Sequence, residues 1–118
     1  MDDRNILVDT SIIIDFLRKK NKQNSLLWKI KEKGFNCIIS TITVFELYAG
    51  AITSKHITDL KKILKWMDII SFTSDIAEQS GEIYKNLKKK NQLIEFRDIF
   101  IGATSIVLNI PLLTFLRK

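Results

Sequence analysis

Short apolar runs alternate along the chain with longer segments that mix apolar and polar residues. Each run is too short for a helix and is bounded by polar or turn-forming residues, which is typical of buried strands. The runs predict strands over residues 6–8, 37–40, 69–72 and 112–115.

The segments between these runs carry apolar residues at helical spacing, and several end in lysines, glycine or proline. They predict helices over residues 12–17, from a cap at Ser25 to Gly34, from Thr41 or Thr43 to Ala51, and over 57–67, 73–90 and 98–108. Strands that alternate with helices favour an α/β fold with a parallel sheet and right-handed crossovers. With no repeat and no linker in its 118 residues, the chain is predicted to form one domain, residues 1–118.

Three acidic residues stand where apolar segments would reach one edge of such a sheet. Asp9 directly follows the first predicted strand, and Glu46 and Asp98 lie near the starts of two predicted helices. Neighbouring carboxylates raise the cost of ionising one another, and two unit charges 4 Å apart repel by about 4 kcal/mol at an effective dielectric near 20. Because a divalent cation removes this cost, the acids predict first a hard-metal site and second a phosphoryl-transfer or nuclease site.

Each acid also has a local explanation. Asp9 precedes a predicted helix and is a good N-cap residue, and the spacing of Thr43 and Glu46 matches a capping box. Asp98 could interact with the dipole of the helix that it begins. These roles leave open why three acids in three apolar settings would be brought together by a parallel sheet.

The composition narrows the class of partner. The net charge of +6 comes from lysines spread over several segments, and with an acidic site that needs a cation it favours nucleic acid over a membrane surface. No apolar run approaches the roughly 20 residues that span a bilayer, and residues 1–5 do not resemble a secretory signal. The single cysteine, Cys37, lies in an apolar run and is predicted to be a buried, inert thiol, which fits a reducing cytosol.

Three blocks of the chain resemble those of PIN-domain ribonucleases, and most closely those of VapC-type toxins from prokaryotic toxin–antitoxin pairs. The blocks are Leu-Val-Asp-Thr-Ser-Ile-Ile-Ile-Asp-Phe-Leu (7–17), Thr-Val-Phe-Glu-Leu-Tyr-Ala-Gly (43–50), and Arg-Asp-Ile-Phe-Ile-Gly-Ala-Thr-Ser (97–105) followed by Ile-Pro-Leu-Leu-Thr (110–114). Each block alone is a weak signal, whereas the three in this order and spacing cover nearly the whole chain.

The resemblance implies a PIN-like three-layer α/β/α fold with a short parallel sheet. It also implies a cytoplasmic endoribonuclease that hydrolyses RNA with Mg²⁺ or Mn²⁺. Asp9, Glu46 and Asp98 would then be the catalytic, metal-binding acids, and Thr10 or Ser11 would assist through a hydroxyl near the metal or substrate. Carboxylates with bound waters suit such hard octahedral cations.

The same resemblance implies a homodimer and inhibition by a small antitoxin protein. The apolar helices over residues 12–17, 44–51 and 57–67 are the segments that we expect to form a groove for a part of that antitoxin.

The chain departs from the family after Thr114. Relatives usually continue with an asparagine, an acid and a last strand, whereas this sequence reads Phe115-Leu116-Arg117-Lys118. This predicts a truncated C-terminal strand and no fourth acid, so the alternative function is a catalytically impaired PIN-like module that binds RNA or antitoxin. A phosphatase of the aspartate-nucleophile type is disfavoured, because it needs a second Asp two residues after Asp9, where Ser11 stands.

Overall fold

A computed structural model describes residues 4–92 and 95–115. Within these residues the predicted strands all form, and every neighbouring pair in the sheet runs parallel. The strands are β1 (Asn5–Val8), β2 (Asn36–Ser40), β3 (Asp68–Ile70) and β4 (Leu112–Leu113), in the spatial order β3-β2-β1-β4. The last two are shorter at their carboxyl ends than the apolar runs predicted.

The predicted helices also form, together with a short 3₁₀ helix over Lys22–Asn24 that the pattern did not predict. Ser25 caps the second helix through its side chain, and Gly34 follows it with φ of 86°, a conformation that favours glycine. The helices are α1 (Thr10–Arg18), α2 (Leu26–Glu32), α3 (Thr41–Gly50), α4 (Ser54–Leu64), α5 (Ser74–Lys89) and α6 (Phe96–Leu108).

Helix α4 begins and ends earlier than its apolar spacing predicted. The Thr53 side chain caps it by accepting a hydrogen bond from the backbone N–H of His56. Its end is tightened by hydrogen bonds from Trp66 to Ile63 and from Met67 to Leu64. Met67 is buried in the turn that leads into β3, so its place in the apolar pattern reflects burial in the core and not helical structure.

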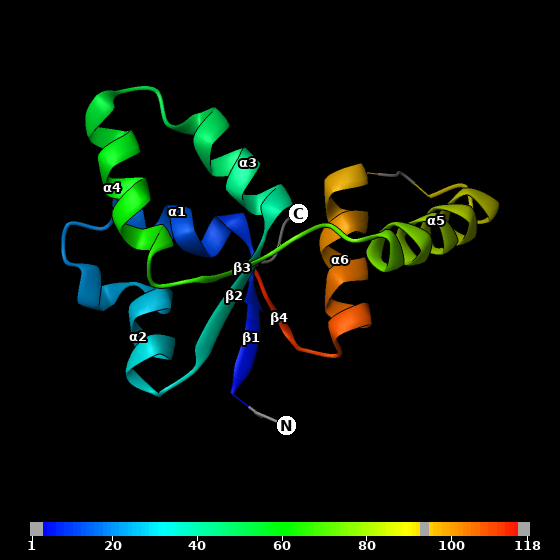
Figure 1. Cartoon of the computed structure of the whole chain (residues 1–118), viewed down its shortest axis with the longest axis horizontal. Coiled ribbons are helices and arrows are strands. Elements are labelled where there is room, and N and C mark those ends of the chain that lie inside the picture. Colours follow the sequence, from blue (N-terminus) through cyan, green and yellow to red (C-terminus); the bar gives the residue numbers. More distant parts are fainter. Residues whose placement is uncertain (1–3, 93–94, 116–118) are drawn as a thin grey trace.

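The helices cover the sheet on both sides, which gives the predicted three layers. Figure 1 shows α1 to α4 on one side of the strands and α5 with α6 on the other. After β3 the chain crosses to the opposite edge, so β4 pairs with β1. The boundary between β1 and β4 is therefore the place where the strand order reverses, and in open α/β sheets ligands bind beyond the carboxyl ends of the strands at such a place.

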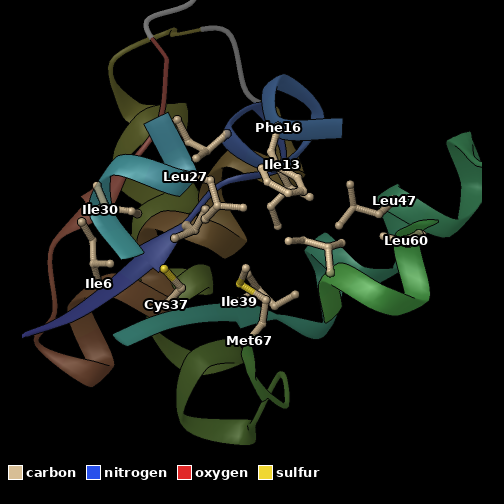
Figure 2. Packing of buried hydrophobic residues seen from close by; sticks show 13 residues of the cluster. Ile6, Ile13, Phe16, Leu27, Ile30, Cys37, Ile39, Leu47, Leu60 and Met67 are labelled. Atoms are coloured by element: carbon tan, nitrogen blue, oxygen red, sulfur yellow. The ribbon is translucent and has the colours of Figure 1, made fainter. Parts of the chain in front are cut away.

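The larger core lies between the sheet and the helices α1 to α4 (Figure 2). Alternate residues of β1 point to opposite faces, so Ile6 and Val8 enter this core while Leu7 packs on the α6 side with Ile38 and Ile101. Cys37 is fully buried in the larger core, which confirms its predicted environment. Fully burying an aliphatic side chain stabilises a fold by about 1.5–3 kcal/mol.

Across residues 4–92 and 95–115, no helix is long and apolar enough to cross a membrane. The predicted truncation of the C-terminal strand depends on residues 116–118, which lie outside the described residues.

Candidate active site

Asp9 stands at the carboxyl end of β1, beside β4, and its side chain is 2% exposed. Its backbone N–H donates to the carbonyl of Leu113 over 3.0 Å, which joins the ends of the two strands. Thr114 donates its hydroxyl to Asp9 Oδ2 over 2.7 Å, and Ser11 donates to the same oxygen over 3.2 Å. Asp9 is the N-cap residue of α1, as its position before the helix predicted, but its side chain makes no capping hydrogen bond there.

Glu46 lies on α3 and faces the same edge, with its side chain 26% exposed. The Thr10 hydroxyl donates to Glu46 Oε1 over 2.6 Å. The predicted capping box does not exist, because α3 begins at Thr41 and Ser40 caps it by accepting from the N–H of Ile42. Thr43 is buried inside the helix, so Glu46 has no capping role there.

The three acids do come together, and they meet around the guanidinium of Arg97. Nη2 of Arg97 donates to Asp9 Oδ1 over 2.6 Å and to Glu46 Oε1 over 2.8 Å. Nε donates to Glu46 Oε2 over 2.9 Å, and Nη1 to Asp98 Oδ1 over 2.8 Å. One side chain therefore bonds to all three predicted acids.

Asp98 is the most open of the acids, with a side chain that is 51% exposed. It lies in the first turn of α6, where a carboxylate also interacts favourably with the helix dipole. The local explanation for Asp98 therefore holds, and its contact with Arg97 places it at the common site as well.

Arg97 was not among the residues predicted for the site, although the sequence carried a signal. A cation in the first turn of a helix is unfavourable to the helix dipole, and Arg97 occupies such a position in α6. A positive charge at that position indicates a compensating partner elsewhere. The partners are acids on two other elements, and only the folded structure identifies them.

Asp9 and Arg97 each stabilise the charged form of the other. Burial raises the pKa of Asp9, but hydrogen bonds from Arg97 and Thr114, with the positive charge of Arg97, outweigh burial and hold the pKa below its ordinary value. Burial likewise lowers the pKa of Arg97, while its hydrogen bonds to Glu46, Asp9 and Asp98 raise it further than burial lowers it. The guanidinium stays charged, and three carboxylates around one cation leave the site net acidic.

Both predicted hydroxyls lie at the acids. Thr10 accepts a hydrogen bond of 3.2 Å from Arg97 while it donates to Glu46. The Ser11 hydroxyl contacts Asp9 and also accepts from the N–H of Phe115 over 3.2 Å. Thr114 supplies a third hydroxyl, for which the sequence predicted no role.

Two hollows flank the cluster and share Phe115 in their walls. One of about 230 Å³ is lined by Asp9, Arg97, Asp98, Ile101, Leu112, Thr114 and Phe115. The other, of about 600 Å³, is lined by Thr10, Ser11, Ile14, Asp15, Arg18, Lys19 and Phe115. The acidic cluster therefore lies beside a wider hollow whose wall includes the positively charged side chains of Arg18 and Lys19.

The donor set fits a hard divalent cation in kind. Among the described residues, no three acidic, histidine or cysteine side chains converge closely enough in their present conformations to hold a metal ion. Asp9 and Glu46 nevertheless bond to one shared nitrogen of Arg97, and Asp98 bonds to another nitrogen of the same group. Carboxylate oxygens are the ligands that Mg²⁺ and Mn²⁺ prefer, and here they already surround a single cationic group.

The chain is similar in sequence to known PIN-domain proteins. The PIN domain family model matches residues 6–115. Ribonuclease VapC1 of Methanocaldococcus jannaschii is 32% identical over 117 residues, which cover 99% of this chain and 79% of that protein. Ribonuclease VapC3 of the same organism is 32% identical over 97 residues, covering 82% of this chain and 94% of its own.

Solved structures agree on the fold. VapBC2 from Rickettsia felis, bound to a DNA fragment from its promoter, superposes with a TM-score of 0.80 at 22% identity, over 93% of this chain and 86% of that one. At this identity the likeness shows a shared fold over most of the chain. The chain therefore belongs to the PIN domain family, as a VapC-type member.

Proposed function

We propose that this protein is a metal-dependent endoribonuclease of the VapC toxin type, which hydrolyses RNA phosphodiester bonds with Asp9, Glu46 and Asp98 as its metal-binding acids. The observation that carries the proposal is that carboxylates from three separate elements surround one cationic side chain, Arg97, where the strand order reverses. Relatives named as ribonucleases supply the class of substrate.

The residues around the acids hold them for this chemistry. Thr114 and Ser11 bond to one oxygen of Asp9, and Thr10 bonds to one oxygen of Glu46, so these two carboxylates are oriented by neighbouring hydroxyl groups. When bound, Mg²⁺ or Mn²⁺ would activate a water molecule and neutralise charge on the scissile phosphate. Ser11 and Thr10 stand between the acids and the wider hollow, where a substrate would approach.

The wider hollow is the path that we propose for RNA. Arg18 and Lys19 line it, and although Lys19 pairs with Asp15 over 3.5 Å, its side chain is 45% exposed. Cations beside a strand of phosphates bind by releasing its counterions. The exposed ring of Phe115 lines the hollow as well and offers a surface on which a base can stack.

Cleavage of a mixed cellular RNA pool with Mn²⁺ tests the proposal. Wild-type protein should give discrete fragments, and these should disappear with EDTA and in the variants Asp9→Asn and Glu46→Gln. Glu82→Gln is the matched control, because Glu82 is an exposed acid on α5 that pairs only locally with Lys85. Cleavage that persists in Asp9→Asn would contradict the assignment of the site.

A second function, an impaired module that binds RNA or antitoxin without cleaving, is favoured by one observation. Arg97 already bonds to all three acids, so a permanently held guanidinium would keep them from a metal ion. Folded wild-type protein that binds RNA but gives no fragments with Mn²⁺ would support this alternative.

The partner that we propose is a small antitoxin. A groove of about 270 Å³ lies between α1, α3 and α4, with the apolar side chains of Ile14, Leu17, Leu47, Ala51 and Leu60 in its walls. Glu46 lines the groove too, so a bound segment would reach the acids. Glu46→Gln should still retain a co-expressed antitoxin. Loss of the antitoxin from a variant that remains folded would mean that Glu46 contributes to antitoxin binding.

A homodimer is the assembly that we propose, in line with the family. Helix α6 exposes Phe96 (61%) and Ile106 (57%), which gives a second copy apolar surface to cover. Mass measured over a range of protein concentrations tests this assembly. A cytoplasmic location stays a prediction.

A further inference from the structure

Arg97 does in this structure what a metal ion would do in the proposed enzyme. It is a single cation, 18% exposed, that bonds to carboxylates from β1's end, α3 and α6. Without it, Asp9 would be a buried negative charge beside Glu46, which is costly. The metal-free cluster is therefore held together by Arg97.

A metal ion and the guanidinium would compete for the same oxygens. Asp9 Oδ2 already accepts from Thr114 and Ser11, so Oδ1, the oxygen on Arg97, is the one facing the cluster. Both oxygens of Glu46 are bonded to Arg97. A cation cannot bind closely between these carboxylates while the guanidinium lies there, because both carry positive charge and need the same space.

A displaced Arg97 side chain could move into an adjoining hollow. Arg97 lines the hollow of about 230 Å³ in front of the acids, together with Thr114 and Phe115. A planar guanidinium binds phosphate oxygens with two parallel hydrogen bonds. A phosphate in this hollow would meet Arg97 next to Asp9 and Asp98, beside the proposed position of the metal.

We propose that Arg97 is an exchangeable counter-cation. Divalent cation binding at Asp9, Glu46 and Asp98 displaces its guanidinium, which then binds a phosphate of the RNA in the adjoining hollow. The inference rests on the proposed function, since it needs a metal at these acids and RNA as the substrate. It assigns Arg97 two successive tasks, neutralising the empty site and binding substrate at the loaded one.

The first experiment follows the Arg97 Nε–H signal of ¹⁵N-labelled wild-type protein during a Mg²⁺ titration. In the metal-free protein this N–H donates to Glu46 and should be protected from exchange with water. Mg²⁺ should shift the signal and remove its protection, while the signals of Arg4 and Arg18 stay unchanged. The variant Arg97→Lys, which lacks the signal, assigns it.

Two results of that titration would overturn the exchange. If the backbone signals of Asp9 and Glu46 saturate with Mg²⁺ while Arg97 keeps its protection, the metal binds without displacing it, and the proposed function survives. If neither the backbone nor Arg97 responds to Mg²⁺, the metal site itself fails, and the exchange fails with it.

The second experiment measures Mn²⁺ binding by calorimetry and RNA cleavage for Arg97→Met. Loss of a competing cation should tighten the Mn²⁺ Kd by roughly tenfold or more, while loss of a phosphate contact raises KM for RNA. Arg4→Met is the matched control, because Arg4 precedes β1 at the opposite end of the strand from Asp9 and donates to the carbonyl of Lys33. Unchanged or weaker Mn²⁺ binding by Arg97→Met would overturn the exchange, and an unchanged KM would overturn the phosphate contact.

Discussion

The Thr114 hydroxyl donates to Asp9 Oδ2 over 2.7 Å, although the two residues are 105 positions apart in the chain. With the N–H of Asp9 bonded to Leu113, this contact ties the end of β4 to the end of β1. Asp9, the most buried acid of the site, is thus positioned by the end of β1, which it follows directly, and by hydrogen bonds with Leu113 and Thr114 at the end of β4.

Replacing Thr114 should therefore disturb both stability and activity. Thr114→Val keeps the shape of the side chain but removes a hydrogen bond to a charged group, and such bonds contribute about 1.5–3 kcal/mol. We expect the free energy of unfolding in urea to fall by about this amount, with slower RNA cleavage. Ser11→Ala, which removes the longer contact of 3.2 Å, should cost less. Equal stability of Thr114→Val and wild type would show that the contact contributes nothing.

Acid should destabilise the metal-free protein through Asp9. Its pKa is lowered in the folded state, so its contribution to stability is present above the ordinary value of about 3.9 and is lost as the pH falls through the folded value. Urea unfolding in EDTA should show stability falling below about pH 4, with a shallower fall in Asp9→Asn. Identical slopes for the two proteins would rule out Asp9 as a source of the pH dependence.

Divalent cations should stabilise the fold in proportion to their binding. At a Mn²⁺ concentration 100 times the Kd, the expected gain is about 2.7 kcal/mol, seen as a rise in Tm that grows with concentration. Asp9→Asn should lose most of this rise, whereas Glu82→Gln should keep it. A rise that is the same in all three proteins would come from binding elsewhere on the surface.

Arg18 and Lys19 should contribute to RNA affinity through charge alone. Replacing both with glutamine should weaken binding and lower the slope of log affinity against log salt by about two, one for each phosphate contact. Lys89→Gln with Lys90→Gln makes the same change in charge at the end of α5, away from the hollow. If the two double variants behave alike, net charge and not this hollow determines RNA binding.

Cys37 should be unreactive in the folded protein. Its side chain is fully buried, and burial raises the pKa of the thiol, so little thiolate is present near neutral pH. Iodoacetamide at pH 8 should label the protein only after unfolding in urea. Rapid labelling of the native state would mean that β2 opens readily.

The strands and the helical layers could be predicted because they follow from where apolar residues fall along the chain. Alternation within β1 sends Ile6 and Leu7 to different cores, and the polar Asp9 marks the strand's end. The same pattern placed the end of α4 too late. Met67 is buried in the core, but the helix ends at Leu64. Periodicity reports burial first and secondary structure second.

The site was predicted only in part, for a related reason. Its acids could be found from their position after apolar segments, but their partner could not, because local sequence does not say which distant charge neutralises which. Arg97 is 88 positions from Asp9 and 51 from Glu46. The capping box predicted at Thr43 was wrong because of a local ambiguity. Ser40, three residues earlier, is an equally good capping residue, and the helix begins after it.

The pairing of Asp9 with Thr114 also bears on how the protein is made. A ribosome that has completed residue 100 has already supplied Asp9, Glu46, Arg97 and Asp98, but not β4 or the threonine that follows it. Because contacts between distant residues form only after the whole intervening loop is available, Asp9 is made long before the strand that anchors it. Translation therefore supplies all three acids before it supplies β4 and the threonine that bonds to Asp9.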